Sequence, residues 1–350
     1  MKKLLKIFSI LACLALTAGF VACGGDGNKG VTQSNLSYAL NEAEDGYVVV
    51  GYEGNATNVV IPEEYNGKPV IAIGDRAFFN CQTLRDIEIP DTVKSIGDFA
   101  FSGCWELGGK MNFGDEDKTD DDFYENIEIP DSVVSIGEGA FMGCNRLTEI
   151  VISDSVESVG ENAFSYCGRL QNVTLENAWA VEAAAFANCD RLTNLTLSYK
   201  GQGPEEDVFF LGYLFGASNY AQNGQFVPAS LTNLKIEECE EIPANAFYGC
   251  KRLLAVEING KATTVGERAF AGCSAMTQLV LSKTVVNMGE NVFENCARLS
   301  IYSKATAQPS GWATEWNGPA RVYWYSEKEP TANPELYWGY SDGEIVEWAK

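Results

Sequence analysis

The amino-acid sequence predicts a solenoid, a rod of short coils stacked on one another, for most of its 350 residues. Three observations lead to this fold class. A phenylalanine recurs about every 23 residues, a cysteine follows it three residues later, and in the clearest copies a short alternating apolar segment precedes a proline. A unit of this length cannot bury its own apolar face, so it has to stack on copies of itself.

Nine phenylalanines set the register, and five of the eight intervals between them are 22 or 23 residues long. The longer intervals predict the same unit with insertions. Eight of the nine precede a cysteine by three residues, while Phe215 precedes Ser218, which we equate with the missing cysteine because serine is its nearest isostere. The structural repeat positions are Phe78, Cys81, Phe101, Cys104, Phe141, Cys144, Phe164, Cys167, Phe186, Cys189, Phe247, Cys250, Phe270, Cys273, Phe293 and Cys296.

One full unit, residues 81–104, shows what each part does. The alternation from Ile87 to Ile89 predicts a short strand with one buried face. Pro90 ends that strand because it cannot donate to a ladder. Gly97 is expected to permit a sharp turn. The segment 100–104 is long enough for about one helical turn that points a ring and a thiol inward.

This pattern resembles the leucine-rich repeats of the BspA-like type, over residues 58–301. The resemblance implies a right-handed leucine-rich-repeat solenoid with a parallel β-ladder on its concave face, short helical turns and irregular segments elsewhere, and β-rich terminal caps. We expect about nine repeats of 22–23 residues, insertions near 108–124 and 200–230, an N-terminal cap over 38–57 and an aromatic C-terminal cap over 302–350. Members of the family are typically bacterial cell-surface proteins, often adhesins that bind host or matrix proteins.

The N-terminal segment predicts export. Three lysines precede an apolar run from Ile7 to Leu16, which is too short to span a bilayer and fits a cleaved signal peptide over 1–22. Small residues before Cys23 resemble a bacterial lipobox, although Phe20 departs from its usual leucine. We therefore expect lipidation at Cys23, a flexible tether over 23–37 and a lipid anchor at the bacterial cell surface. The alternative is an ordinary secretory peptide with an incidental cysteine.

Composition excludes several kinds of function. The formal net charge of −23 disfavours nucleic-acid binding, because such a surface repels phosphates. The chain has no histidine, which removes imidazole-based nucleophilic catalysis and histidine-ligated zinc. A hydrolase that uses paired carboxylates is the weakest alternative, since nothing in the sequence specifies their geometry. We expect no enzyme and no cofactor.

The repeated cysteines allow a metal ladder, a set of disulfides or a packing position. The sequence contains no CxxC pair, so zinc is disfavoured, whereas adjacent coils would bring Cα atoms within disulfide range. We favour buried free thiols, because a residue that recurs beside Ala-Phe behaves as a small apolar group. Cys239 lies among four glutamates, whose charge is expected to make it a poor nucleophile.

The side chains between the strand hydrophobes are expected to face the concave side and to form the binding surface for a protein ligand. This surface is acidic early and rich in Asn and Thr later, and a merely solvated β-face is the alternative. The candidate residues are Asp86, Glu88, Asn126, Glu128, Glu149, Asn172, Thr174, Asn194, Thr196, Asn233, Lys235 and Glu257.

Both insertions are further places for specificity. The segment 108–124 carries clustered carboxylates, but it lacks EF-hand spacing, so a solvated loop is favoured over a calcium site. The segment 200–230 contains Tyr213, Tyr220 and Phe226 and is either a partner-contacting loop or padding.

The C-terminal tail holds five of the seven tryptophans. Its rings are expected to cap the last coil. The alternative is a carbohydrate-binding module that uses Trp324 and Trp338, because aromatic rings stack well on flat ligands. The sequence as a whole predicts a surface lipoprotein that works by protein–protein contact, most simply adhesion.

Overall fold

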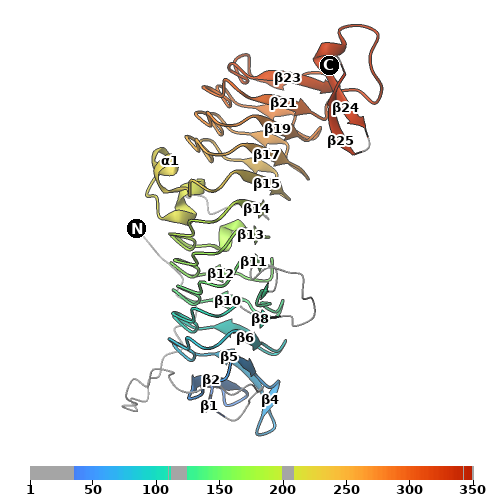
Figure 1. Cartoon of the computed structure of the whole chain (residues 1–350). Coiled ribbons are helices and arrows are strands. Elements are labelled where there is room, and N and C mark those ends of the chain that lie inside the picture. Colours follow the sequence, from blue (N-terminus) through green and yellow to red (C-terminus); the bar gives the residue numbers. More distant parts are fainter. Residues whose placement is uncertain (1–34, 109, 112–123, 199–208, 342, 349–350) are drawn as a thin grey trace.

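The computed structural model describes residues 35–108, 110–111, 124–198, 209–341 and 343–348. Over these residues the chain winds into a curved rod of stacked coils, with β1 at one end and the β24–β25 hairpin at the other (Figure 1). The fold class predicted from the repeat is confirmed: the molecule is a right-handed parallel β-solenoid with a ladder on its concave face. Within the described part of the chain, no helix is long and apolar enough to cross a membrane.

The main ladder is built from the alternating apolar segment of each unit. It forms one ten-stranded sheet, parallel except for its last pair. Its strands, in spatial order, are β11 (Glu149–Ile152), β13 (Asn172–Leu175), β14 (Asn194–Ser198), β15 (Asn233–Glu237), β17 (Ala255–Ile258), β19 (Gln278–Leu281), β21 (Ser300–Ser303), β23 (Arg321–Tyr325), β24 (Tyr337–Ser341) and β25 (Glu344–Glu347). Nearer the N-terminus the same position forms the parallel pair β3 (Asn58–Val60) and β6 (Asp86–Glu88).

A second ladder runs beside the first, and the sequence reasoning missed it. The two residues just before the repeated glycine, such as Ser95 and Ile96 before Gly97, pair in parallel from coil to coil. These strands are β5 (Lys68–Ile73), β7 (Ser95–Ile96), β10 (Ser135–Ile136) and β12 (Ser158–Val159), and further along β16 (Glu241–Ile242), β18 (Thr264–Val265), β20 (Asn287–Met288) and β22 (Gly311–Trp312). A regular coil therefore carries two short strands, such as β6 and β7 on either side of the turn that begins at Pro90.

The phenylalanines form two continuous stacks in the core. From Phe78 to Phe186, neighbouring ring centroids lie 5.0, 5.1, 5.1 and 5.4 Å apart with interplanar angles of 5–12°. From Phe247 to Phe293 the distances are 4.9 and 5.6 Å. These rings are at most 1% exposed. The stack is interrupted in the inserted coil, where Phe209 approaches Phe247 at 6.5 Å.

The cysteines have a hydrogen-bonding role besides their packing role. The thiol of Cys104 donates to the carbonyl of Phe78 in the preceding coil at 3.0 Å. The same bond recurs, at 3.2–3.4 Å, for Cys144, Cys167, Cys189, Cys273 and Cys296. All nine cysteines of the described residues are buried and free, which agrees with the expected buried thiols.

Hydrogen-bonded turns take the place of the expected helical turn. In each regular coil the residues two before and two after the phenylalanine adopt left-handed backbone angles, as Phe99 (φ 54°) and Gly103 (φ 77°) do around Phe101. This alternation turns every second amide toward the next coil, so that Phe99, Phe101 and Gly103 donate to its carbonyls at 2.7–2.8 Å. Backbone hydrogen bonds therefore join the turns of neighbouring coils, much as they join neighbouring strands.

Gly97 serves a different purpose from the expected sharp turn. Its φ angle is not in the left-handed region, but a Cβ at this position would lie 2.6 Å from the backbone nitrogen of Asp75 in the preceding coil. The glycine is thus required because two coils approach closely there. The Asp75 carboxylate completes the contact by accepting from the Asp98 amide at 2.9 Å.

The inserted coil departs from the repeat, and equating Ser218 with the missing cysteine is wrong. Ser218 is exposed, and its amide donates to Gln222 Oε1 at 2.8 Å. The buried Asn223 holds the insertion instead, because its Oδ1 accepts from the Gly212 amide at 2.8 Å. The short helices here are η2 (Leu211–Phe215), η3 (Tyr220–Gln222) and α1 (Asn223–Phe226), and η1 (Ala178–Ala180) lies one coil earlier.

Antiparallel strands finish both ends of the rod. At the N-terminal end β1 (Leu36–Leu40) pairs with β2 (Tyr47–Tyr52), and β4 (Glu64–Tyr65) turns back on β5. At the other end β24 follows the short helix η4 (Pro334–Leu336) and pairs with β25. A small hairpin of β8 (Lys110–Met111) and β9 (Tyr124–Glu125) marks the first insertion.

Candidate binding face on the parallel ladder

The strand register aligns two columns of side chains on the concave face. The first runs through Glu149, Asn172, Asn194, Asn233, Ala255, Gln278, Ser300 and Arg321. The second runs through Val151, Thr174, Thr196, Lys235, Glu257, Val280, Tyr302 and Tyr323. Eight of the twelve residues that the sequence nominated for this face thus lie in one continuous sheet.

The asparagines of the first column bond to one another. Asn194 Nδ2 donates to Asn172 Oδ1 at 2.7 Å, and Asn233 Nδ2 donates to Asn194 Oδ1 at 2.8 Å. Each amide is therefore oriented by its neighbour, although Asn194 and Asn233 stay exposed. A ladder of this kind fixes the direction in which polar groups meet a partner.

The middle of the face is a hollow that is lined by one cation, Lys235, and one carboxylate, Glu257. The hollow has a volume of about 320 Å³, and its lining includes Asn194, Thr196, Asn233, Lys235, Glu257, Gln278 and Val280. Lys235 Nζ lies 2.6 Å from Glu237 Oε1. This hydrogen bond to Glu237 raises the pKa of Lys235 and keeps it cationic.

The C-terminal hairpin folds over the end of this face. Tyr302 and Tyr323 stack at 5.3 Å, and Trp338 of β24 covers them as a second small core that is separate from the main one. Tyr302 donates its hydroxyl hydrogen to Glu347 of β25 at 2.7 Å. Burial, and then the Glu347 contact, raise the pKa of Tyr302.

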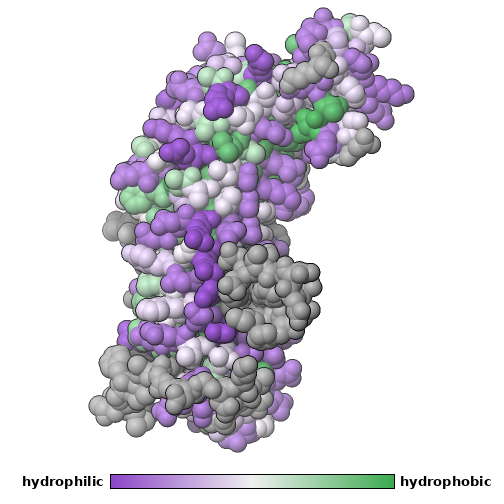
Figure 2. Space-filling view, in the orientation of Figure 1, coloured by the Kyte–Doolittle hydropathy of each residue, from purple (hydrophilic) through white to green (hydrophobic). Residues whose placement is uncertain are grey.

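The same hairpin carries one more exposed aromatic residue near the ladder. Tyr340 is 45% exposed, and its pKa is raised first by burial and then by the negative charge of Glu257 on the ladder. The residues that line the hollow do not include Tyr340. Figure 2 shows a hydrophobic area near the C-terminal end of an otherwise largely hydrophilic side. Sequence reasoning missed Tyr302, Tyr340 and Glu347, although Ser300–Ser303 continues the alternating pattern of the earlier strands.

The two tryptophans nominated as aromatic contacts do not present open faces. Trp338 is 0% exposed, and its indole N–H donates to the Ser303 carbonyl at 2.8 Å. Trp324 is half-buried and lies 5.7 Å from Trp312 of the main core. Trp338 as a sugar-stacking residue is therefore wrong, because a fully buried ring has no surface to offer.

The four nominated residues nearest the N-terminus lie outside the ten-stranded sheet. Asp86 and Glu88 belong to β6, while Asn126 and Glu128 lie in an extended segment without a strand. Asn126 has a structural role: its Oδ1 accepts from the amides of Thr148 and Glu149, both at 3.0 Å, where other coils use a backbone carbonyl. This end of the face offers the exposed carboxylates of Glu88 and Glu128.

The other sequence-based hypotheses concern metals, thiols and the anchor. Within the described ranges no group of three or more Cys, Asp or Glu side chains is placed to hold a metal ion. Most of the acidic insertion, residues 112–123, and the lipidation position Cys23 lie outside the described residues. Burial raises the pKa of Cys239 to about 12, with the charge of Glu238 as a smaller cause, so desolvation more than its acidic neighbours suppresses the thiolate.

Comparison with protein families gives one match. The family described as "BspA type Leucine rich repeat region" matches residues 52–116, 120–211 and 220–306, in six copies. These ranges cover more than half of the chain and include the ladder from β11 to β21 and part of the inserted coil. A search of curated proteins finds no significant match.

Solved structures with the same kind of repeat include three bacterial proteins. A leucine-rich-repeat protein of T. pallidum (TpLRR) is 24% identical, with 71% of this chain and 91% of that chain covered and a TM-score of 0.42. A leucine-rich cell surface protein of Faecalibacterium prausnitzii is 21% identical (84% and 98% covered, TM-score 0.33). The pneumococcal vaccine antigen PcpA is 17% identical (89% and 94% covered, TM-score 0.37).

Proposed function

Because the chain belongs to the BspA-type leucine-rich-repeat family, we propose that it is an exported, lipid-anchored surface protein whose concave ladder face binds another protein. Adhesion to host, matrix or other surface proteins is the role that this proposal assigns. The observation that carries it is the hollow over β14 to β19, where exposed amides, one cation and one carboxylate meet. The exposed Tyr340 of the hairpin is near enough to feel the charge of Glu257 in this hollow. Fixed polar groups next to an aromatic residue are what a specific protein contact requires.

The structure also favours binding over catalysis as the role of this face. The charged groups of the hollow, Lys235 and Glu257, lie at directly paired positions of β15 and β17. The Glu237 contact keeps Lys235 protonated, so it would be a poor general base. A leucine-rich-repeat solenoid typically serves as a binding scaffold, and these groups suit recognition of a charged and polar partner.

The binding proposal is tested with the purified full chain on immobilised fibronectin, fibrinogen, laminin and collagen. We expect saturable binding to at least one of them, weakened about tenfold or more by Lys235→Glu or Thr196→Arg. Lys94→Glu makes the same charge change at an exposed position outside the hollow and should leave binding within twofold. Equal loss in all three variants, or no binding to any of the four proteins, would count against the proposal.

The anchor is tested separately. In cells fed a radiolabelled fatty acid, the wild type and the Cys13→Ser variant should both carry label, and Cys23→Ser should carry none. Labelling that survives Cys23→Ser would remove lipidation at this position. The binding result is independent of this outcome because it uses purified protein.

A carbohydrate-binding role would have to use other rings than those first nominated. Of the hairpin aromatics, Tyr340 has its ring partly open and lies beside the ladder. A glycan array with wild type and Tyr340→Ala distinguishes the two functions. Sugar binding that depends on Tyr340 would support carbohydrate binding over protein binding as the function of this face.

A further inference from the structure

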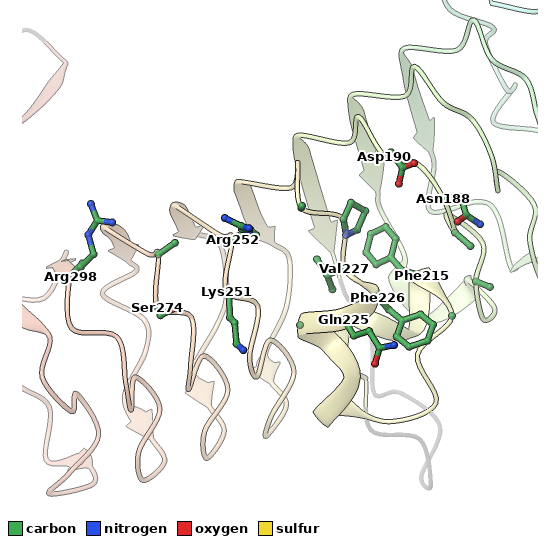
Figure 3. Close-up of a pocket in the computed structure, with 17 residues that line it drawn as sticks. Asn188, Asp190, Phe215, Gln225, Phe226, Val227, Lys251, Arg252, Ser274 and Arg298 are labelled. Atoms are coloured by element: carbon green, nitrogen blue, oxygen red, sulfur yellow. The ribbon is translucent and has the colours of Figure 1, made fainter.

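The inserted coil creates a second hollow, away from the ladder face. It has a volume of about 1000 Å³. On one side lie Phe226 and Gln225 of α1, and on the other lie the loop residues that follow the cysteine in three successive coils, among them Lys251, Arg252, Ser274 and Arg298 (Figure 3). None of these residues belongs to the concave columns described above.

The hollow is cationic in a protein that is strongly anionic overall. Lys251, Arg252 and Arg298 line it together with a single carboxylate, Asp190, whereas the whole chain has 25 basic and 48 acidic residues. All three cations are exposed, and none has an ion-pair partner among the described residues. Arg268, by contrast, is paired with Glu294 at 2.9 Å. Three unpaired cations thus lie together where the insertion leaves space.

The arginines occupy one repeated position. They stand two residues after the cysteine in Cys-x-Arg-Leu, which the sequence repeats at Arg146, Arg169, Arg191, Arg252 and Arg298. Arg252 and Arg298 are two coils apart, which places them about 10 Å from each other at a strand spacing of about 4.8 Å. Three residues of a peptide in the extended polyproline II conformation span about the same distance and return to the same face.

The same insertion carries three exposed aromatic residues, of which Phe226 lines the hollow. Phe226 is 36% exposed, Tyr213 37% and Tyr220 44%, and Tyr220 packs edge-on against Tyr248 of the next coil at 5.7 Å. Tyrosine and arginine are enriched at the centres of protein interfaces. Phe226, Val227 and Pro228 give the hollow an apolar side opposite its arginines.

We propose that this hollow binds an acidic, extended peptide segment of a partner protein, with carboxylates at three-residue intervals on Arg252 and Arg298 and an apolar side chain against Phe226. Guanidinium groups hold carboxylates through paired, charge-assisted hydrogen bonds, which accounts for arginine here in preference to lysine. The chain would then have two independent binding faces, and this site does not depend on the function proposed for the ladder.

The test measures binding of fluorescein-labelled (Glu-Glu-Leu)₄ to the full chain by fluorescence anisotropy at low salt. We expect saturable binding, weakened about tenfold or more by Arg252→Gln with Arg298→Gln, and weakened by Phe226→Ala. Lys94→Gln with Lys283→Gln removes the same charge from exposed positions outside the hollow and should change the affinity less than twofold. The (Gln-Gln-Leu)₄ peptide should not bind.

Three results would overturn the proposal. One is no binding of the acidic peptide up to millimolar concentration, and another is equal weakening by the control pair, which would indicate only a diffuse charge effect. The third is arginine-dependent binding of a heparin oligosaccharide without binding of the peptide, which would assign the hollow to anionic polysaccharides instead. Lys235→Glu on the ladder should leave peptide binding unchanged, so failure of either site is recognised separately.

Discussion

Removing one ring from the phenylalanine stack should destabilise the rod strongly and locally. Phe164 is fully buried, and its ring lies 5.1 Å from that of Phe141 and 5.4 Å from that of Phe186. Phe→Ala changes in cores cost about 3–5 kcal/mol, and each stacked ring pair accounts for about 0.5–1.5 kcal/mol of this. Since domains are stable by about 5–15 kcal/mol, Phe164→Ala should remove a large fraction of the free energy of unfolding.

Urea denaturation followed by circular dichroism measures the total cost of Phe164→Ala. Phe226→Ala is the matched control, because its ring is 36% exposed and its loss should change stability by less than about 1 kcal/mol. Hydrogen exchange adds the location: each coil contacts only its neighbours, so protection should fall most between residues 141 and 186. A cost below about 1 kcal/mol, or an equal loss of protection along the whole rod, would refute the stacking argument.

Three further predictions concern the coil contacts, the thiols and the hairpin. Gly160→Ala should lower the free energy of unfolding, measured by urea denaturation, by about 1–3 kcal/mol, because its Cβ would lie 2.5 Å from the Glu138 backbone nitrogen. Gly51→Ala is the control and should cost less, since its Cβ would make only an ordinary contact at 3.9 Å. Equal costs of the two substitutions would contradict close packing between the coils. Burial raises the pKa of Cys296 from 9.0 to about 11, so between these pH values the folded state keeps a proton that the unfolded chain releases. The free energy of unfolding should therefore be constant below about pH 9 and fall by about 1 kcal/mol per pH unit for such a thiol between pH 9 and 11. A urea midpoint that does not fall over this range would contradict this prediction. Trp338→Ala should uncover the two stacked tyrosines, which increased binding of a hydrophobic dye would reveal, and unchanged dye binding would show that the hairpin stays closed without this ring.

The sequence predicted the features that every coil repeats. The Phe and Cys register, the strand ahead of Pro90 and the residues of the concave columns follow from local patterns that recur often enough to be recognised. The alternating left-handed residues were overlooked, although Asn80, Gly103 and Gly143 show the preference for Asn and Gly two residues after the phenylalanine. Their role depends on contacts between coils, which one repeat alone does not reveal.

The features that the sequence did not predict arise where the repeat stops. Ser218 aligned with the cysteines by spacing, but the inserted coil satisfies its backbone through Asn223 and leaves Ser218 exposed. Likewise the sequence left open whether Trp338 helps to cap the last coil or binds a ligand, and it did not predict that this ring packs on Tyr302 and Tyr323. Long-range docking of a non-repeated segment has no periodic pattern from which to infer it.

The antiparallel strands at the two ends of the rod limit where further coils can be added to it. A parallel ladder left open at either end would offer its unpaired edge to the ladder of a second molecule. Here β1 and β25 run against the direction of the ladder, so growth by end-to-end addition is discouraged. One more coil placed between β17 and β19, in contrast, would repeat contacts that already exist and extend the binding face by about 4.8 Å. The number of coils can therefore vary from within, while the two ends stay the same.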